Sequence, residues 1–454
     1  MTKQRSSSSV VMIVTGLSII VVAIISMIWP DLQLQQPDLK WETVVVPAAI
    51  HYAEAKQQAG SKAINPRTPL QGIVVVITGA TSGIGLGLTK RLASLGATII
   101  AVGRNREKLQ HVQQSVTGGT IETVVADFRD LQSVAVAAEQ IVTHYPRIDV
   151  LVNNAGLHQR LEGLVPPYAV SQQGYEVAFG VNYLAHFLWT EKLLPVLLKS
   201  GGRIVQVSSR FHYAVDGSDL ATHHGTTPPL ASQNGGSPGF YLFRTQRQYA
   251  NSKLSQILHA RALNARYPAT TTTTPTQLLA VSACPSWVGT DIGGPKGSMM
   301  HSLLQFFTFP STGFGLSSIL HAILDTDTTT SRSTANVDID DDDDDDKTAP
   351  PKTTDPRHQR DFYVNTAVSM PQSTESRSSG GSSSAGSSTA LDYWTYQRFP
   401  VRDVVFAAFG HIYIMFGQRY IPTREVAPSS TASYNPQLQH ELYEWSVQAV
   451  AAWL

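Results

Sequence analysis

Tyr249 and Lys253 are the residues whose types and spacing point most directly to chemistry. They lie four positions apart in a stretch that predicts a helix, so they share one face of that helix. A free tyrosine, with a pKa of about 10, is a poor acid or base at neutral pH. A cation one turn away favours the phenolate and brings proton exchange with a substrate oxygen within reach. Taken alone, the pair is better explained by an amphipathic helix with a surface lysine, so other motifs must decide.

A glycine-rich turn over 78–85 follows an apolar, β-branched run over 73–77 and precedes a helical pattern. Strand, turn and helix form the context in which such glycines bind a dinucleotide. Gly79 permits the tight turn, while Gly83 and Gly85 let the backbone approach a pyrophosphate, to which the helix N-terminus offers free N–H groups. The cofactor-binding candidates in this turn are Thr78, Gly79, Thr81, Ser82, Gly83, Ile84 and Gly85.

The cofactor is predicted to be NADP(H). An NAD site usually has an acid about 20 residues after the glycine turn, at the end of the second strand. The segment 102–105 contains no acid, and the guanidinium of Arg104 suits a 2′-phosphate. The alternative is that Arg104 is an ordinary surface charge at the start of a helix. Asp127, at the end of the third strand, is expected to meet the adenine.

Further motifs in the same order resemble the short-chain dehydrogenase/reductase family, over about Gly72 to Asp291. Chance does not account for so many unrelated matches in sequence. The motifs are Asn153-Asn154-Ala155-Gly156 after the fourth strand, Asn182 in a helix, Ser208-Ser209 after the fifth strand, Tyr249-Ala250-Asn251-Ser252-Lys253, and Pro285 and Thr290 after the sixth strand.

The resemblance implies a catalytic set of Asn182, Ser209, Tyr249 and Lys253. Tyr249 would exchange a proton with the substrate oxygen, which Ser209, the second serine of its pair, would hold. Lys253 would also hold the nicotinamide ribose, and Asn182 would fix a water that links Lys253 to solvent. Further cofactor contacts are implied at Asn154, Ala155, Gly156, Tyr249, Lys253, Pro285 and Thr290.

Three segments narrow the resemblance to the retinol dehydrogenase and WW-domain oxidoreductase branch, although no WW domain is visible. This branch implies interconversion of an apolar alcohol and carbonyl, such as a retinoid, a steroid or a lipid aldehyde or ketone. Many of its members carry an N-terminal membrane anchor. The segments are Phe179–Phe187, Arg203–Ser209 and Tyr434–Ser446.

The sequence departs from the family in three places. Ser209 and Tyr249 are forty residues apart, so 221–239 is expected to loop out as an insertion beside the active-site mouth. The expected Pro-Gly after the sixth strand reads Pro285-Ser286. Two low-complexity insertions, acidic 325–360 and Ser/Gly-rich 373–390, interrupt the C-terminal region. These insertions leave a second hypothesis open: a nucleotide-binding scaffold or redox sensor whose insertions bind partners.

Apolar strands alternate with helical stretches, which predicts the α/β class: one doubly wound parallel sheet, a Rossmann domain with helices on both faces. The catalytic domain is predicted over 72–324, with a late strand in 361–372 and a helical, substrate-side segment over 391–454. The expected strands are 73–77, 98–102, 121–126, 149–152, 203–207 and 278–282. The first expected helix follows the glycine turn and ends at 95, and the others are 105–115, 131–145, 175–199 and 249–266.

Val10–Trp29 is uncharged and long enough for a helix to cross a hydrocarbon core of about 30 Å. It follows a short tail, 1–9, and precedes a connector, 30–71, with a helical piece near 47–60. A cleaved signal peptide is the alternative, but the stretch exceeds the roughly 7–15 apolar residues of such a peptide. The sequence therefore predicts a transmembrane anchor in a single-pass protein, with the endoplasmic reticulum as the expected membrane and the side of the catalytic domain left open.

The composition and charge of the chain exclude several other classes of protein. The 34 basic and 34 acidic residues balance, but 325–360 carries a charge of −6 and the rest of the chain +6. This excess is too diffuse for nucleic-acid binding. Cys284 is the single cysteine, which excludes an intrachain disulfide and a cysteine-built metal site, and no metal is predicted. The expected partners are a lipophilic small molecule and the membrane, with a homo-oligomer left open.

Overall fold

The structure is a computed structural model that describes residues 45–56, 63–158, 170–209, 211–212, 215–222, 238–268, 278–285, 312–326, 362–366, 423–426 and 430–454. Within these ranges, no helix has the length and apolar character needed to cross a bilayer. The predicted anchor Val10–Trp29 lies outside them, as do Thr290, the stretch 373–390 and nearly all of 325–360.

One sheet forms the centre of the described part of the molecule, with the strand order β3-β2-β1-β4-β5-β6-β7-β8. Neighbouring strands are parallel throughout except for β8, which pairs antiparallel with β7. The predicted α/β class with a single parallel Rossmann-type sheet is therefore confirmed. The strands are β1 Val74–Thr78, β2 Thr98–Gly103, β3 Ile121–Val125, β4 Val150–Asn153, β5 Arg203–Val207, β6 Leu279–Cys284, β7 Phe362–Thr366 and β8 Thr423–Val426.

The central strands are apolar because helices cover both of their faces. Every residue of β4, β5 and β6 is buried, whereas β3, at the edge of the sheet, also exposes side chains. In the parallel register, Val76 of β1 lies beside Ile100 of β2 on one side and Leu151 of β4 on the other. Runs of Val, Ile and Leu therefore predict the sheet centre well.

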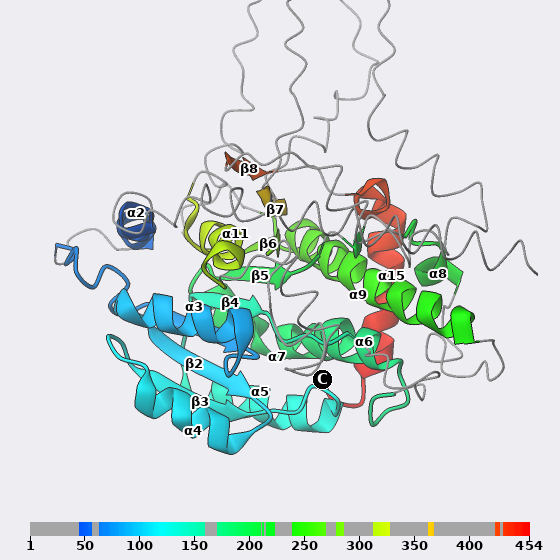
Figure 1. The fold of residues 1–454 in the computed structure, drawn as a ribbon, viewed down its shortest axis with the longest axis horizontal. Coiled ribbons are helices and arrows are strands. Elements are labelled where there is room, and N and C mark those ends of the chain that lie inside the picture. The colour runs from blue at the N-terminus through cyan, green and yellow to red at the C-terminus, as the bar shows by residue number, and fades with distance from the viewer. Residues whose placement is uncertain are drawn as a thin grey trace, which may run out of the picture.

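The helices form two layers, each with its own apolar cluster. One cluster joins α5, α7, α9 and α15 to one face of the sheet, and the other joins α2, α3, α4 and α11 to the opposite face. Figure 1 shows the last helix, α15, lying against α9. The helices are α2 Val46–Lys56, α3 Gly83–Ser94, α4 Arg106–Ser115, α5 Leu131–His144, α6 Val177–Phe179, α7 Ala185–Lys199, α8 Ser218–Thr222, α9 Pro238–Arg266, α11 Thr312–Leu324 and α15 Pro436–Val450, with a π turn Gly180–Leu184 before α7.

The two ends of the predicted insertion 221–239 overlap two helices. Helix α8 runs to Thr222, and α9 begins at Pro238, well before Tyr249. A proline at the start of a helix costs no hydrogen bond, because the N–H groups of the first turn have no intrahelical partner. The predicted helix 249–266 is therefore only the C-terminal part of α9, while 223–237 lies outside the described residues.

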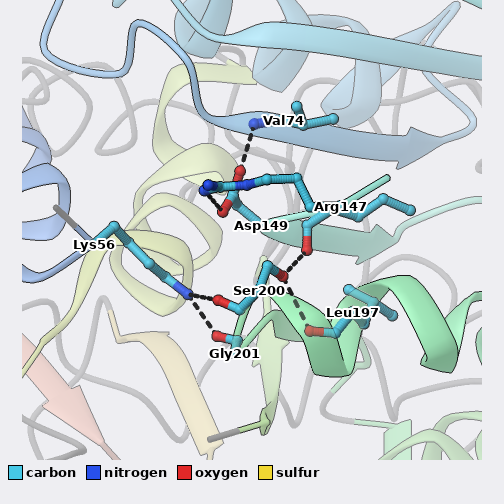
Figure 2. A network of polar contacts seen from close by, with 8 residues as sticks. Lys56, Val74, Arg147, Asp149, Leu197, Ser200 and Gly201 are labelled. Atoms are coloured by element: carbon cyan, nitrogen blue, oxygen red, sulfur yellow. Dashed lines mark hydrogen bonds and ion pairs between the residues drawn. The ribbon is translucent and has the colours of Figure 1, made fainter. Parts of the chain in front are cut away.

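A polar network holds the C-terminal turn of α2 against the edge of the sheet where the strands begin (Figure 2). Lys56 Nζ donates to the carbonyl oxygens of Ser200, at 3.1 Å, and Gly201, just after α7. Nearby, the Asp149 carboxylate accepts from the N–H of Val74 at 2.9 Å. Burial lowers the pKa of Lys56 to about 8. Because β1, β4 and β5 begin at this edge, the network lies opposite the edge where the predicted site residues gather.

Candidate active site

The described site residues gather where β1, β4, β5 and β6 end. Neighbouring parallel strands bring their carboxyl ends to one edge of the sheet, and the segments that leave them meet there. The glycine turn follows β1, residues 154–156 follow β4, Ser209 follows β5 and Pro285 follows β6. The topology thus assembles segments that are distant in the sequence.

The glycine turn is too crowded for side chains at two of its positions. Gly79 has a φ of 68°, and a Cβ there would lie 2.9 Å from Ala155 Cα. A Cβ on Gly85 would lie 2.2 Å from the carbonyl oxygen of Gly79, a backbone atom that has no side-chain freedom to move away. Glycine is therefore required for the turn to close against the loop after β4.

The start of α3 fits a dinucleotide phosphate. Ser82 is the residue before the first helical turn, but its side chain makes no capping hydrogen bond, and that turn carries no acid. The amides of the turn are therefore available to an anion, which the helix dipole also favours. This feature and the crowded glycine turn show that the residues present fit the diphosphate of a nicotinamide dinucleotide.

Arg104 and Asp127 follow β2 and β3 beside the glycine turn. A Cβ on Gly103 would lie 3.2 Å from Thr81 Cγ2, so the end of β2 packs against the turn. Arg104 is exposed, whereas Asp127 is half-buried and accepts from the N–H of Arg129 at 3.0 Å. Both residues therefore border the predicted cofactor site on the side of β2 and β3.

Thr78 ties the loop after β4 to the end of β1. Its hydroxyl oxygen accepts from the N–H groups of Asn154, at 2.9 Å, and Ala155, at 2.8 Å. The Asn154 side chain donates in turn to the Thr78 carbonyl at 2.8 Å. The loop continues to Gly156, where a Cβ would lie 3.6 Å from Lys253 Nζ. It therefore joins the predicted cofactor turn to the predicted catalytic residues.

Tyr249, Ser209 and Lys253 lie together. The Ser209 side chain lies near enough to the Tyr249 phenol to lower its pKa, and Lys253 Nζ is 5.5 Å from the centre of the Tyr249 ring. Ser208 has a different task, because its hydroxyl donates to the backbone carbonyl of Lys253 at 2.8 Å. Of the two serines, Ser209 is therefore the one near the Tyr249 phenol, whereas Ser208 anchors α9.

Burial governs the protonation of Tyr249 and Lys253 in the protein without cofactor. Burial raises the pKa of Tyr249 above its usual range, and the nearby Ser209 hydroxyl offsets this only in part. Burial also lowers the pKa of Lys253 to about 7. The sequence predicts instead that the Lys253 cation lowers the pKa of Tyr249. Here the Nζ atom donates to the Val207 carbonyl, at 2.8 Å, and to Gln256 Oε1, at 3.1 Å.

Asn182 lies in the π turn, and its polar atoms bind protein groups. Its side chain exchanges hydrogen bonds with the backbone of Leu157, at 2.8 and 2.9 Å, and donates to Ser252 Oγ at 3.0 Å. Its backbone carbonyl accepts from Gln256 Nε2 at 2.9 Å. Gln256, absent from the predicted set, thus links Asn182 directly to Lys253. Its place one turn after Lys253 on the same helix is the sequence signal for it.

Two aromatic rings beside Tyr249 are also missing from the predicted set. The ring centres of His158 and Phe211 lie 4.9 and 5.6 Å from that of Tyr249. Each residue comes two positions after a predicted motif residue, Gly156 or Ser209, and this proximity is the only signal for them in the sequence. Both rings make edge contacts with the ring of Tyr249, at interplanar angles of 69° and 79°.

Comparison with known proteins identifies the family. A family model described as short chain dehydrogenase matches residues 73–215. A Streptomyces protein named as a daunorubicin C-13 ketoreductase is 32% identical over 249 residues, which cover 54% of this chain and 75% of that protein. The chain therefore belongs to the short-chain dehydrogenase/reductase family.

Within that family, the chain falls in the retinol dehydrogenase-like branch. Mouse retinol dehydrogenase 13 is 30% identical over 218 residues, which cover 46% of this chain and 59% of that protein. An oxidoreductase of Schizosaccharomyces pombe is 33% identical over 208 residues, covering 43% and 56%. The chain thus spans little more than half the length of these two relatives. The branch predicted from the motifs is confirmed.

Proposed function

We propose that this protein is an NADP(H)-dependent oxidoreductase that interconverts an apolar alcohol and its carbonyl by hydride transfer. The observation that carries the proposal is the meeting of three side chains: Ser209 lies near enough to the Tyr249 phenol to lower its pKa, and Lys253 Nζ is 5.5 Å from the centre of the same ring. An arrangement that only binds nucleotide has no need of these three side chains together. Membership of a family whose relatives are named as dehydrogenases and oxidoreductases supports the same reaction class.

The proposed mechanism uses two hydroxyl groups that converge from β5 and α9. A nicotinamide dinucleotide, when bound, would supply the hydride for reduction and would accept it for oxidation. Ser209 and Tyr249 hold one substrate oxygen between them, which stabilises the negative charge that develops on it. Tyr249 gives its proton to that oxygen in reduction and takes it back in oxidation. Lys253, held by Val207 and Gln256, would bind the ribose next to the nicotinamide.

Arg104 is proposed to bind the 2′-phosphate of NADP(H). It is exposed directly after β2, beside the glycine turn, and no acid stands at this end of the strand. The next residue, Asn105, caps α4 by accepting from the N–H of Lys108 at 2.8 Å. Arg104 is therefore not needed to start the helix. Asp127 would contact the adenine, and Pro285 and Thr290 the nicotinamide end.

The substrate is proposed to be apolar: a retinoid, a steroid or a lipid aldehyde or ketone. The rings of His158 and Phe211 beside Tyr249 suit an extended apolar molecule. Related proteins are named as retinol dehydrogenase and polyprenol dehydrogenase. Val10–Trp29 is proposed to anchor the chain in the membrane where such substrates dissolve, with the endoplasmic reticulum as the proposed membrane.

The full chain should oxidise NADPH when supplied with aldehydes and ketones from these classes, as followed by NADPH absorbance. Tyr249→Phe should reduce the rate by roughly 100-fold or more while NADPH still binds, because the acid is lost and the ring remains. Tyr145→Phe is the matched control. The hydroxyl of Tyr145 donates a hydrogen bond to Glu122 near the start of β3, at the opposite end of the strands from the site.

Two results would count against the proposal. Turnover by Tyr249→Phe at the original rate would rule out the proton-transfer role. NADPH binding with no turnover across the substrate panel would instead favour a scaffold or sensor.

Arg104→Ala should weaken the binding of NADPH by about tenfold and leave the binding of NADH unchanged, because only NADPH carries the 2′-phosphate.

A further inference from the structure

His186 is a buried histidine on α7 that lies outside the predicted catalytic set. The residue is only 1% exposed, and its ring packs against Phe128 with the centres 4.4 Å apart and the planes tilted by 36°. Both ring nitrogens have partners: Nδ1 is 2.8 Å from the carbonyl oxygen of Val181, and Nε2 is 2.9 Å from Thr78 Oγ1. A buried ring with two such contacts has one orientation and one tautomer.

The tautomer follows from the chemistry of the partners. The carbonyl of Val181 can only accept, so Nδ1 must carry the proton. The lone pair of Nε2 then accepts from the hydroxyl of Thr78. Burial lowers the pKa of His186 to about 3, so the ring stays neutral at physiological pH. Val181 lies in the π turn, whose carbonyl thereby sets the direction of the bond from Thr78.

Thr78 has one proton to give and two lone pairs to offer. Giving the proton to His186 leaves both lone pairs for the amides of Asn154 and Ala155, which lie at 2.9 and 2.8 Å. The other acceptor within reach, the carbonyl of Val152, is 3.4 Å away and therefore weaker. His186 thus fixes the hydroxyl orientation that holds the loop after β4.

This loop borders both halves of the site. On one side, a Cβ on Gly79 would lie 2.9 Å from Ala155 Cα. On the other, a Cβ on Gly156 would lie 3.4 Å from Asn182 Oδ1. We propose that His186 is a positioning residue which, through Thr78, holds residues 154–156 in the conformation that binds the nicotinamide dinucleotide. The proposal rests on the proposed function only in requiring that the chain binds this cofactor.

The test is NADPH affinity, measured by fluorescence titration of the full chain without substrate. His186→Phe keeps a flat ring against Phe128 but removes the acceptor, and should weaken NADPH binding by about tenfold. His186→Gln is the conservative rescue, because its amide can both donate to Val181 and accept from Thr78. Its affinity should stay within about threefold of the original.

A double-mutant cycle separates positioning from packing. In a Thr78→Val background, His186→Phe should cause no further loss of affinity, because the hydroxyl that it orients is already gone. An equal loss in both backgrounds, or an unchanged affinity of folded His186→Phe, would overturn the proposal. If His186→Phe does not fold by circular dichroism, His186→Met against His186→Gln gives the same contrast. Failure of the unmodified chain to bind NADPH would refute the proposed cofactor instead.

Discussion

At the scale of single residues, the candidate site is an arrangement of buried groups that hold one another in place. Lys253 donates hydrogen bonds to Val207 and Gln256, and the Ser209 side chain lies near the Tyr249 phenol. Burial makes the ionised forms of both Lys253 and Tyr249 costly until other charges arrive. The site is therefore arranged to bind a charged ligand, and the folded protein is less stable when that ligand is absent.

Lys253 gives this cost a pH dependence. Its pKa is about 7 in the folded protein, against about 10.4 in an unfolded chain. Between these values the unfolded chain binds more protons, so stability rises with pH from about 7 to about 10; it falls again as pH is lowered over this range and levels off below 7. Lys253→Met should remove this dependence and raise the free energy of unfolding at pH 7 by roughly 2–4 kcal/mol.

Urea unfolding without cofactor, at pH 7 and pH 9.5, measures the effect. Lys56→Met is an informative comparison, because the pKa of Lys56 is lowered only to about 8 and its ammonium has two backbone acceptors. Lys56→Met should show a smaller increase in the free energy of unfolding than Lys253→Met. A Lys253→Met chain that keeps the original pH dependence would show that another group causes it.

At the scale of elements, close backbone contacts decide where the site can form. Helix α3 approaches β1 and the loop after β4 so closely that Gly85 has space for hydrogen alone. The π turn before α7 directs the carbonyls of Val181 and Asn182 to His186 and Gln256. Irregular turns of this kind are frequent at functional sites, and here two side chains use the carbonyls that the turn presents.

Gly85→Ala should lower stability by roughly 2–4 kcal/mol, because its Cβ would meet the Gly79 carbonyl at 2.2 Å and Asn154 Nδ2 at 2.6 Å. It should also abolish NADPH binding in the measured range. Gly87→Ala on the same helix is the control, since the atoms nearest to its Cβ belong to the Leu316 side chain and not to the backbone. Thermal unfolding and NADPH titration compare the two, and equal effects would contradict this account of the turn.

At the scale of the whole molecule, segments from both ends of the chain complete the catalytic domain. Near the start, Val45, Ala49 and Tyr52 join the apolar cluster on one face of the sheet. Near the end, α15 packs on α9, and Ser446 bonds to Tyr183 at 2.7 Å. The acidic and Ser/Gly-rich stretches fall between β strands of one sheet, so they interrupt the sequence without dividing the domain.

The proposed anchor belongs to this scale. Ile19→Lys with Ile20→Lys in the full chain should move the protein from the membrane pellet to the supernatant after carbonate extraction, because two charges in the span oppose insertion. NADPH affinity should not change, since α2 and the sheet are untouched. Leu32→Lys with Leu34→Lys, placed just outside the span, is the control. A pellet fraction that both pairs leave unchanged would refute the anchor.

The sequence by itself determined the parallel sheet, its helices and the family, because runs of buried Val, Ile and Leu and the glycine turn are local patterns. The order of the motifs along the chain also singled out Ser209, Tyr249 and Lys253. The structure alone showed that Gln256 links Lys253 to Asn182, that His186 orients Thr78, and that α9 begins at Pro238. These facts depend on which groups meet when distant segments pack. Only tertiary packing decides which buried polar atom pairs with which partner, and so which histidine or glutamine serves the site.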